Sequence, residues 1–158
     1  MVSYNQEVYA MSHWHLIESE EDIHRLLQEY NGFHDSCIAG AHFETGCLVT
    51  SARAMANGSP DQRILRITFH SQWVSQPLEL CFGGVRQFSL TGWQDNYFCE
   101  IFDCCLRFQK DPPFSKDMPG ILWADWANFS PTDPITILEE PMCSFVIANS
   151  LKWRFADA

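Results

Sequence analysis

Residues 34–37 of the 158-residue chain, His34-Asp35-Ser36-Cys37, place an imidazole, a carboxylate and a thiol within four positions. A neighbouring histidine can activate a cysteine as a nucleophile, and a carboxylate can orient that imidazole. Catalytic triads, however, are assembled in space and seldom from adjacent residues. Asp and Ser also have ready hydrogen-bonding uses in turns. We therefore interpret His34, Asp35 and Cys37 as binding-site candidates at a polar turn and assign no catalytic residue.

Asp125 is a further candidate, because the sequence Trp123-Ala124-Asp125-Trp126 places its carboxyl group between indoles. Apolar surroundings raise the pKa of a carboxyl group and can make it a general acid. The alternative is a structural carboxylate that binds a turn or pairs with an arginine. Convergence of Asp125 with His34, Asp35 and Cys37 in one deep cleft would favour an enzyme, and their separation would favour a binding protein.

Metal and cofactor sites receive little support from the sequence. His13 and His15 would share one face of a strand, which zinc can use, but two ligands alone are a weak signal. The chain has 7 Cys and no C-x-x-C pair, and an odd number without an export signal favours reduced thiols. On a strand, Cys104 and Cys105 would point to opposite faces. We predict no metal and no cofactor.

The elements that must position these residues begin with a helix after Ser19, which can cap it. Glu20, Glu21 and Asp22 fill the first turn, where negative charge meets the positive end of the helix dipole. Asn31-Gly32 is a reasonable stop. The apolar face repeats with helical spacing at Ile23, Leu26, Leu27 and Tyr30. The acidic first turn becomes a candidate binding surface.

Most of the remaining chain has the patterns of strands. Alternating apolar and polar side chains predict strands within 63–73 and 78–82, and strand is favoured over helix for 96–109. Segments 37–44 and 47–52 flank Thr45-Gly46 and predict a hairpin there. Residues 53–62 are predicted to form a loop.

The strongest strand signal is the alternation that runs through residues 143–155. Such a long alternation does not fit the 3.6-residue period of a helix. We expect this strand to cross the centre of the sheet, with a bend at Asn149-Ser150. A further short strand is expected at 121–126.

Together these elements predict an α+β fold with one N-terminal amphipathic helix. Its main part is an antiparallel sheet of roughly eight strands, with a barrel or a sandwich as the curled alternatives. The length is that of one ordinary domain, and neither a repeat nor a linker divides the chain. We therefore expect a single domain over 1–158.

The charge of the chain restricts its partners. Ten basic and 20 acidic residues give a formal charge of -10, which argues against nucleic acid and anionic membranes. No apolar run approaches the roughly 18 residues of a membrane span, and the N-terminus lacks the order of a signal peptide. A cytoplasmic location is expected. Residues 1–35 hold seven acids against Arg25 alone, and such a surface suits a basic partner.

Four segments, GFHDSCI, PLELCFGGVRQFSL, GILWADW and SFVIANSLKWRF, resemble a family of small bacterial proteins of unknown function. The resemblance spans residues 32–155. Part of the outline is similar to immunity-type proteins of bacterial toxin systems. The resemblance implies a cytoplasmic single domain, and the immunity part implies binding and neutralising a toxin without chemistry. It implies no catalytic residues.

We predict a non-enzymatic protein-binding module, with a basic protein as the favoured partner because opposite fields speed encounter. One alternative is a small-ligand pocket or an enzyme with its site around His34, Asp35 and Asp125. Another is a symmetric homodimer in which sheet edges pair.

Overall fold

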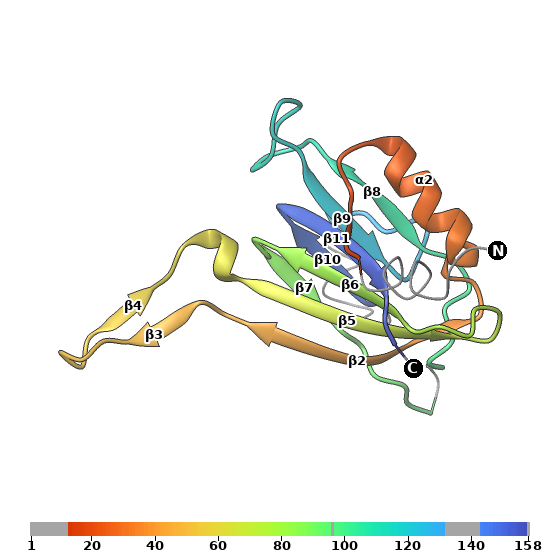
Figure 1. Ribbon diagram of the computed structural model, residues 1–158, viewed down its shortest axis with the longest axis horizontal. Helices are drawn as coiled ribbons and strands as arrows, with labels where there is room; N and C mark the ends of the chain where they lie inside the picture. Colours follow the sequence, from red (N-terminus) through yellow and green to blue (C-terminus); the bar gives the residue numbers. More distant parts are fainter. Residues whose placement is uncertain (1–12, 96, 132–142, 158) are drawn as a thin grey trace, which may run out of the picture.

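The computed structural model describes residues 13–95, 97–131 and 143–157 of the chain. In these ranges one α-helix accompanies eleven strands, and every strand pair is antiparallel. The predicted α+β class with a mainly antiparallel sheet is therefore confirmed. The strands form two sheets and a two-stranded ribbon, and they are not closed into a barrel (Figure 1).

The two sheets are open, so each ends in an edge strand. The larger sheet contains, in spatial order, β1 (His15–Leu16), β11 (Ser150–Phe155), β6 (Leu78–Gly83), β5 (Ile64–Ser71) and β2 (Ser36–Glu44). The smaller sheet contains, in spatial order, β7 (Gln87–Ser89), β10 (Phe145–Ala148), β9 (Gly120–Ala124) and β8 (Cys105–Gln109). Strand β2 is thus one edge of the larger sheet, and β7 is one edge of the smaller sheet.

Strands β10 and β11 are separated only by Asn149, where the chain passes from the smaller sheet into the larger one. The Asn149 N–H donates to the Gly83 carbonyl at 3.0 Å, and the Arg86 Nε donates to the Asn149 side-chain oxygen at 3.1 Å. This confirms the bend predicted at Asn149-Ser150. The single strand expected over 143–155 across the centre of one sheet is wrong, because β10 and β11 belong to different sheets. A strand that changes sheets at a bend is one way to make a corner between two packed sheets.

Helix α2 (Glu20–Glu29) begins as the sequence predicts. The Ser19 hydroxyl accepts from the Asp22 N–H at 3.2 Å, and the Asp22 carboxylate accepts from the Ser19 N–H at 2.8 Å. This reciprocal pair is a capping box, which satisfies donors at the helix start. The helix buries Ile23 and Leu26 against the sheets, and no helix in the described ranges is long and apolar enough to span a membrane.

The core lies between the sheets and the helix and is rich in aromatic rings. Phe33, which follows the helix in the short 3-10 turn η1 (Asn31–Phe33), lies 5.1 Å from Phe69 and 5.9 Å from Trp123 between ring centroids. Tyr30 packs edge-on against Phe33 at 5.2 Å. Strand β5 contributes the alternating side chains that the sequence indicates, with Phe69 fully buried.

Two sequence predictions are wrong in residues 45–62. The chain does not turn back at Thr45-Gly46, because β2 pairs with β5 and continues through Gly46 into β3 (Cys47–Val49). It reverses at residues 50–54 and returns through β4 (Met55–Asn57) and the short 3-10 turn η2 (Pro60–Gln62). The expected loop over 53–62 therefore contains a strand. Gly46 supplies a kink at φ 73° and not a turn, and its carbonyl accepts from the Gly58 N–H at 2.8 Å.

We call residues 45–62 the arm, because they project from the two sheets with no other described part of the chain over them (Figure 1). No residue of the arm is buried. By contrast, the strand expected over 96–109 forms only at its end, as β8, and Ile101 makes an isolated bridge to Ser36 at the edge of β2.

Candidate functional site

The turn that leads from α2 into β2 has an unusual backbone. Asn31, Gly32, Phe33 and Asp35 all have positive φ, at 50°, 61°, 65° and 56°. The left-handed region is costly for residues with a side chain, above all for a bulky one such as Phe33. Packing of the Phe33 ring in the core holds this conformation in place. The backbone of this turn therefore determines how the side chains of His34 and Asp35 are oriented at the start of β2.

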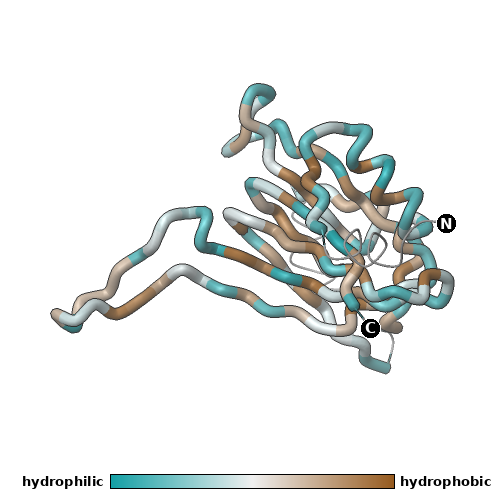
Figure 2. Tube along the Cα trace, viewed as in Figure 1, coloured by the Kyte–Doolittle hydropathy of each residue, from teal (hydrophilic) through white to brown (hydrophobic). Residues whose placement is uncertain are grey.

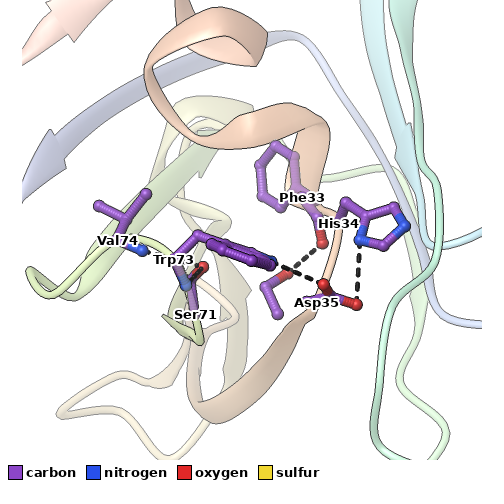
Figure 3. Close-up of polar contacts among 7 residues, drawn as sticks. Phe33, His34, Asp35, Ser71, Trp73 and Val74 are labelled. Carbon is purple, nitrogen blue, oxygen red and sulfur yellow. Dashed lines mark hydrogen bonds and ion pairs between the residues drawn. The ribbon is translucent and has the colours of Figure 1, made fainter.

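The Asp35 carboxylate joins the turn to the loop after β5 (Figure 3). It accepts from Trp73 Nε1 at 2.6 Å and lies 2.9 Å from His34 Nδ1. The Trp73 hydrogen bond is the main reason why the pKa of Asp35 is lowered. The Asp35 carboxylate therefore holds the turn against the loop after β5. The Asp35 N–H, which donates to the Ile101 carbonyl, holds it against the segment before β8.

Cys37 follows on β2, and its thiol contacts Cys99 and the backbone of His70. Burial raises the pKa of the Cys37 thiol, and the contact with Cys99 adds to this rise. A cysteine nucleophile needs the opposite, because the thiolate is the reactive form. Cys37, His70 and Cys99 line a shallow depression of about 230 Å³ that also includes Asp35 and Glu100.

Asp125 lies in a different hollow, the groove of about 330 Å³ beside the edge of β2. Its carboxylate accepts from the Tyr97 hydroxyl at 2.8 Å and from the Ser144 N–H at 2.8 Å. Burial raises the pKa of Asp125, although both hydrogen bonds favour the ionised form. The pKa of Tyr97 is also raised, by burial first and by its bond to Asp125 second. The remaining wall is formed by 38–41, 90–93, Cys99 and Ile101.

The residues that the sequence singles out therefore line two hollows and not one cleft. Asp35 and Cys37 belong to the depression, Asp125 belongs to the groove, and Cys99 lies on both. His34 lines neither of these two hollows and keeps a side chain that is 54% exposed.

The acidic first turn of α2 divides into two roles. Asp22 accepts from the N–H groups of Glu18 and Ser19 and so belongs to the helix cap. These hydrogen bonds lower the pKa of Asp22. Glu20 and Glu21 are exposed and remain the part of this turn that can meet a partner.

His13 and His15 lie with ring centroids 5.9 Å apart, and His15 stacks on Trp153 at 4.5 Å. Burial lowers the pKa of His15. Over the described ranges, no three His, Cys, Asp or Glu side chains gather in a way that could hold a metal ion.

Sequence reasoning missed an exposed apolar surface on the arm. Leu48, Val49 and Met55 are 51%, 56% and 89% exposed. Figure 2 shows hydrophobic residues along β3 with no other segment beside them except β4. A signal was present, because residues 45–62 hold only Arg53 and Asp61 as charged side chains. Charged residues make up a smaller share of this segment than the 19% of the whole chain.

Comparisons with known proteins place the chain in no family. No protein-family model, curated protein or solved structure matches it.

Proposed function

We propose that the chain is a non-enzymatic protein-binding module that holds its partner with the arm. The observation that carries this proposal is the exposure of Leu48, Val49 and Met55 on a ribbon that has no buried residue. A two-stranded ribbon alone is marginally stable in water, so a surface that covers it would stabilise it. Full burial of an exposed side chain of this kind contributes about 1.5–3 kcal/mol, and the half-covered Leu48 and Val49 would contribute a smaller part of that.

The charge distribution suggests different roles in binding for the arm and for the rest of the described chain, which we call the body. The one Arg and one Asp of the arm cancel, so the charge of -10 belongs to residues outside it. Acidic residues such as Glu20 and Glu21 would speed the approach of a basic protein, and the neutral arm would supply contacts that salt hardly weakens. A basic toxin, neutralised in the cytoplasm by an immunity-type protein, is the specific partner that we propose on the resemblance described above.

The separation of the candidate residues supports binding over catalysis. His34 and Asp35 bond each other, Cys37 contacts Cys99, and Asp125 lines the other hollow. None of these contacts gives a base beside a thiol of lowered pKa, which nucleophilic catalysis by cysteine requires.

The test compares an arm variant with a matched control by capture from an extract of the native host. The arm variant carries Leu48→Ser, Val49→Ser and Met55→Ser, and the control carries Met118→Ser and Phe102→Ser, which replace exposed apolar residues outside the arm. We expect the wild type and the control to retain a partner that the arm variant loses. With the purified partner, titration calorimetry should show binding by the arm variant that is at least about tenfold weaker.

Washing at low and then at high salt separates the two contributions. A partner that stays bound to the wild type at high salt, and is lost only by the arm variant, supports the arm as the main contact. Equal capture by the wild type and the arm variant would overturn the proposal.

A further inference from the structure

We propose that the groove beside Asp125 is a second binding site, which takes an extended peptide segment and pairs one of its Lys or Arg side chains with Asp125. This site lies outside the arm, and its proposal does not depend on what the arm binds.

The groove lies along a sheet edge that already accepts added chain. Strand β2 ends the larger sheet, and its outer edge is used by Ile101 at one position. The Ile101 N–H donates to the Ser36 carbonyl at 2.8 Å, and the Asp35 N–H donates to the Ile101 carbonyl at 2.9 Å. Residues 38–41, the next part of this edge, line the groove. In the described part of the chain, β2 has no strand partner on that side.

Edge strands present N–H and C=O groups that can pair with another strand. Extended peptides bind many proteins in this way, with backbone hydrogen bonds for affinity and side-chain contacts for specificity. A peptide that continues the pairing begun by Ile101 would lie between β2 and residues 90–93, which follow β7, the edge of the smaller sheet. It would occupy the opening between the two sheets.

The wall of the groove leaves room for a strand. Residues 39–41 are Ala, Gly and Ala, and a register shift between Ile38 and Gly40 interrupts the regular pairing of β2 with β5. A Cβ atom built on Gly40 would meet no other atom within 4 Å. Small residues at this edge allow another backbone to approach closely.

Asp125 gives the groove its selectivity. Among the described residues, those that line the groove include this carboxylate and no Lys, Arg or His. The partners of the carboxylate are the Tyr97 hydroxyl and the Ser144 N–H, which are both uncharged. A partly buried charge without a counter-charge is costly, and a cationic side chain from the ligand would remove that cost. Burial raises the pKa of Asp125, as expected for a carboxyl group that has no positively charged side chain beside it.

Trp93 supplies an apolar surface for the same side chain. It lines the groove and is 77% exposed. Lys and Arg have apolar stems that pack on aromatic rings, and their charged ends attract the ring face. Trp and Arg are also enriched among the residues that dominate binding energy at interfaces.

The experiment selects peptides on the folded full-length chain. Phage-displayed random peptides of about ten residues, the upper length of a typical strand, are panned against the wild type, Gly40→Val and Asp125→Asn. Valine suits a strand and adds a branched side chain at a residue that lines the groove, while Asn keeps the size of Asp125 and removes its charge. We expect the wild-type pool to be enriched in peptides with Lys or Arg between β-branched residues. Gly40→Val should enrich no such pool, and Asp125→Asn should lose the preference for a basic residue.

The peptide most enriched on the wild type is then labelled and measured by fluorescence polarisation. Replacing its basic residue by Glu should weaken binding at least about tenfold, and Asp125→Asn should abolish that difference. The Leu48→Ser, Val49→Ser, Met55→Ser arm variant should bind the peptide as the wild type does, which separates this site from the proposed function. Circular dichroism checks that each variant is folded.

Three results would overturn the proposal. One is a wild-type pool without basic residues. Another is enrichment of the same peptides on Gly40→Val as on the wild type. The third is a concentration-dependent dimer that Gly40→Val abolishes and the selected peptide does not, because this would assign the groove to a second copy of the chain.

Discussion

The body and the arm are built from the same kind of strand and differ in what covers it. Strand β5 alternates apolar and polar side chains, and Leu65, Ile67 and Phe69 are almost fully buried because they share one core with side chains of the smaller sheet and of helix α2. Strand β3 offers Leu48 and Val49, which remain half exposed. Burial is therefore decided by the second layer and not by the strand's own residues. In the arm, no described segment supplies that layer.

The comparison also separates stability from function. In the body, apolar side chains hold the fold together, so their loss should unfold the protein. In the arm, similar side chains touch little else in the described chain, so their loss should leave the fold intact and remove binding. The predictions below test this contrast, from the largest expected effect to the smallest.

The largest effect is expected at Phe33, the buried ring at the centre of the body. Phe33→Ala removes contacts with Tyr30, Phe69 and Trp123 and leaves a cavity. We expect the free energy of unfolding to fall by about 3–5 kcal/mol, measured by urea denaturation. Leu48→Ala in the arm should change it by less than about 0.5 kcal/mol. Similar losses for both variants would mean that the arm packs as the body does.

The next effect compares two glycines with similar backbone angles. Gly84, in the body, has φ 60°, and a Cβ there would lie 2.7 Å from Asn149 Cγ at the bend between the sheets. Gly46, in the arm, has φ 73°, and a Cβ there would lie 3.0 Å from Gln62 Cβ. The left-handed backbone alone costs a residue with a Cβ roughly 1–2 kcal/mol.

We expect Gly84→Ala to lower the free energy of global unfolding by at least about 1–2 kcal/mol, because the strain falls on the corner of the body. Gly46→Ala should leave global unfolding nearly unchanged, because the arm can open alone. Hydrogen exchange should instead speed up at the Gly58 amide, which donates to the Gly46 carbonyl. A global loss in Gly46→Ala as large as in Gly84→Ala would show that the arm and the body unfold as one unit.

The difference between the arm and the body also explains which structural features could be predicted from the sequence. Helix α2 and the bend at Asn149 depend on local capping and on alternation, and both are visible in short windows of sequence. The arm depends on the long-range pairing of β2 with β5. Thr45-Gly46 has the composition of a turn, and only the position of β5 shows that it continues an extended strand. Pairing between distant segments overrides a local turn signal here.

The candidate sites follow the same rule. His34, Asp35 and Cys37 lie close together in the sequence, which therefore shows them as a group, but their partners Trp73 and Cys99 come from distant segments. Asp125 was singled out by its neighbouring indoles, whereas its hydrogen bonds come from Tyr97 and Ser144. Residue type marks a candidate, and the fold decides what it meets.

The smallest effects are expected from two carboxyl groups of the body whose pKa values shift in opposite directions. Burial raises the pKa of Asp125, and the Trp73 hydrogen bond lowers the pKa of Asp35. An unfolded chain ionises Asp at a pKa of about 3.9. As pH rises through this value toward the raised pKa, Asp125 ionises first in the unfolded state, so its contribution to stability falls and then levels off.

Asp35 follows the reverse course. Its contribution is present above the unfolded pKa and is lost as pH falls through the lowered folded pKa. We therefore measure urea denaturation from acidic to neutral pH for the wild type, Asp125→Asn and Asp35→Asn. The stability of the wild type minus that of Asp125→Asn should decrease as pH rises, and the corresponding difference for Asp35→Asn should increase. Differences that change in the same direction would mean that the two carboxyl groups have similar surroundings, in conflict with one lying partly buried in the groove and the other bound by an indole N–H at the turn.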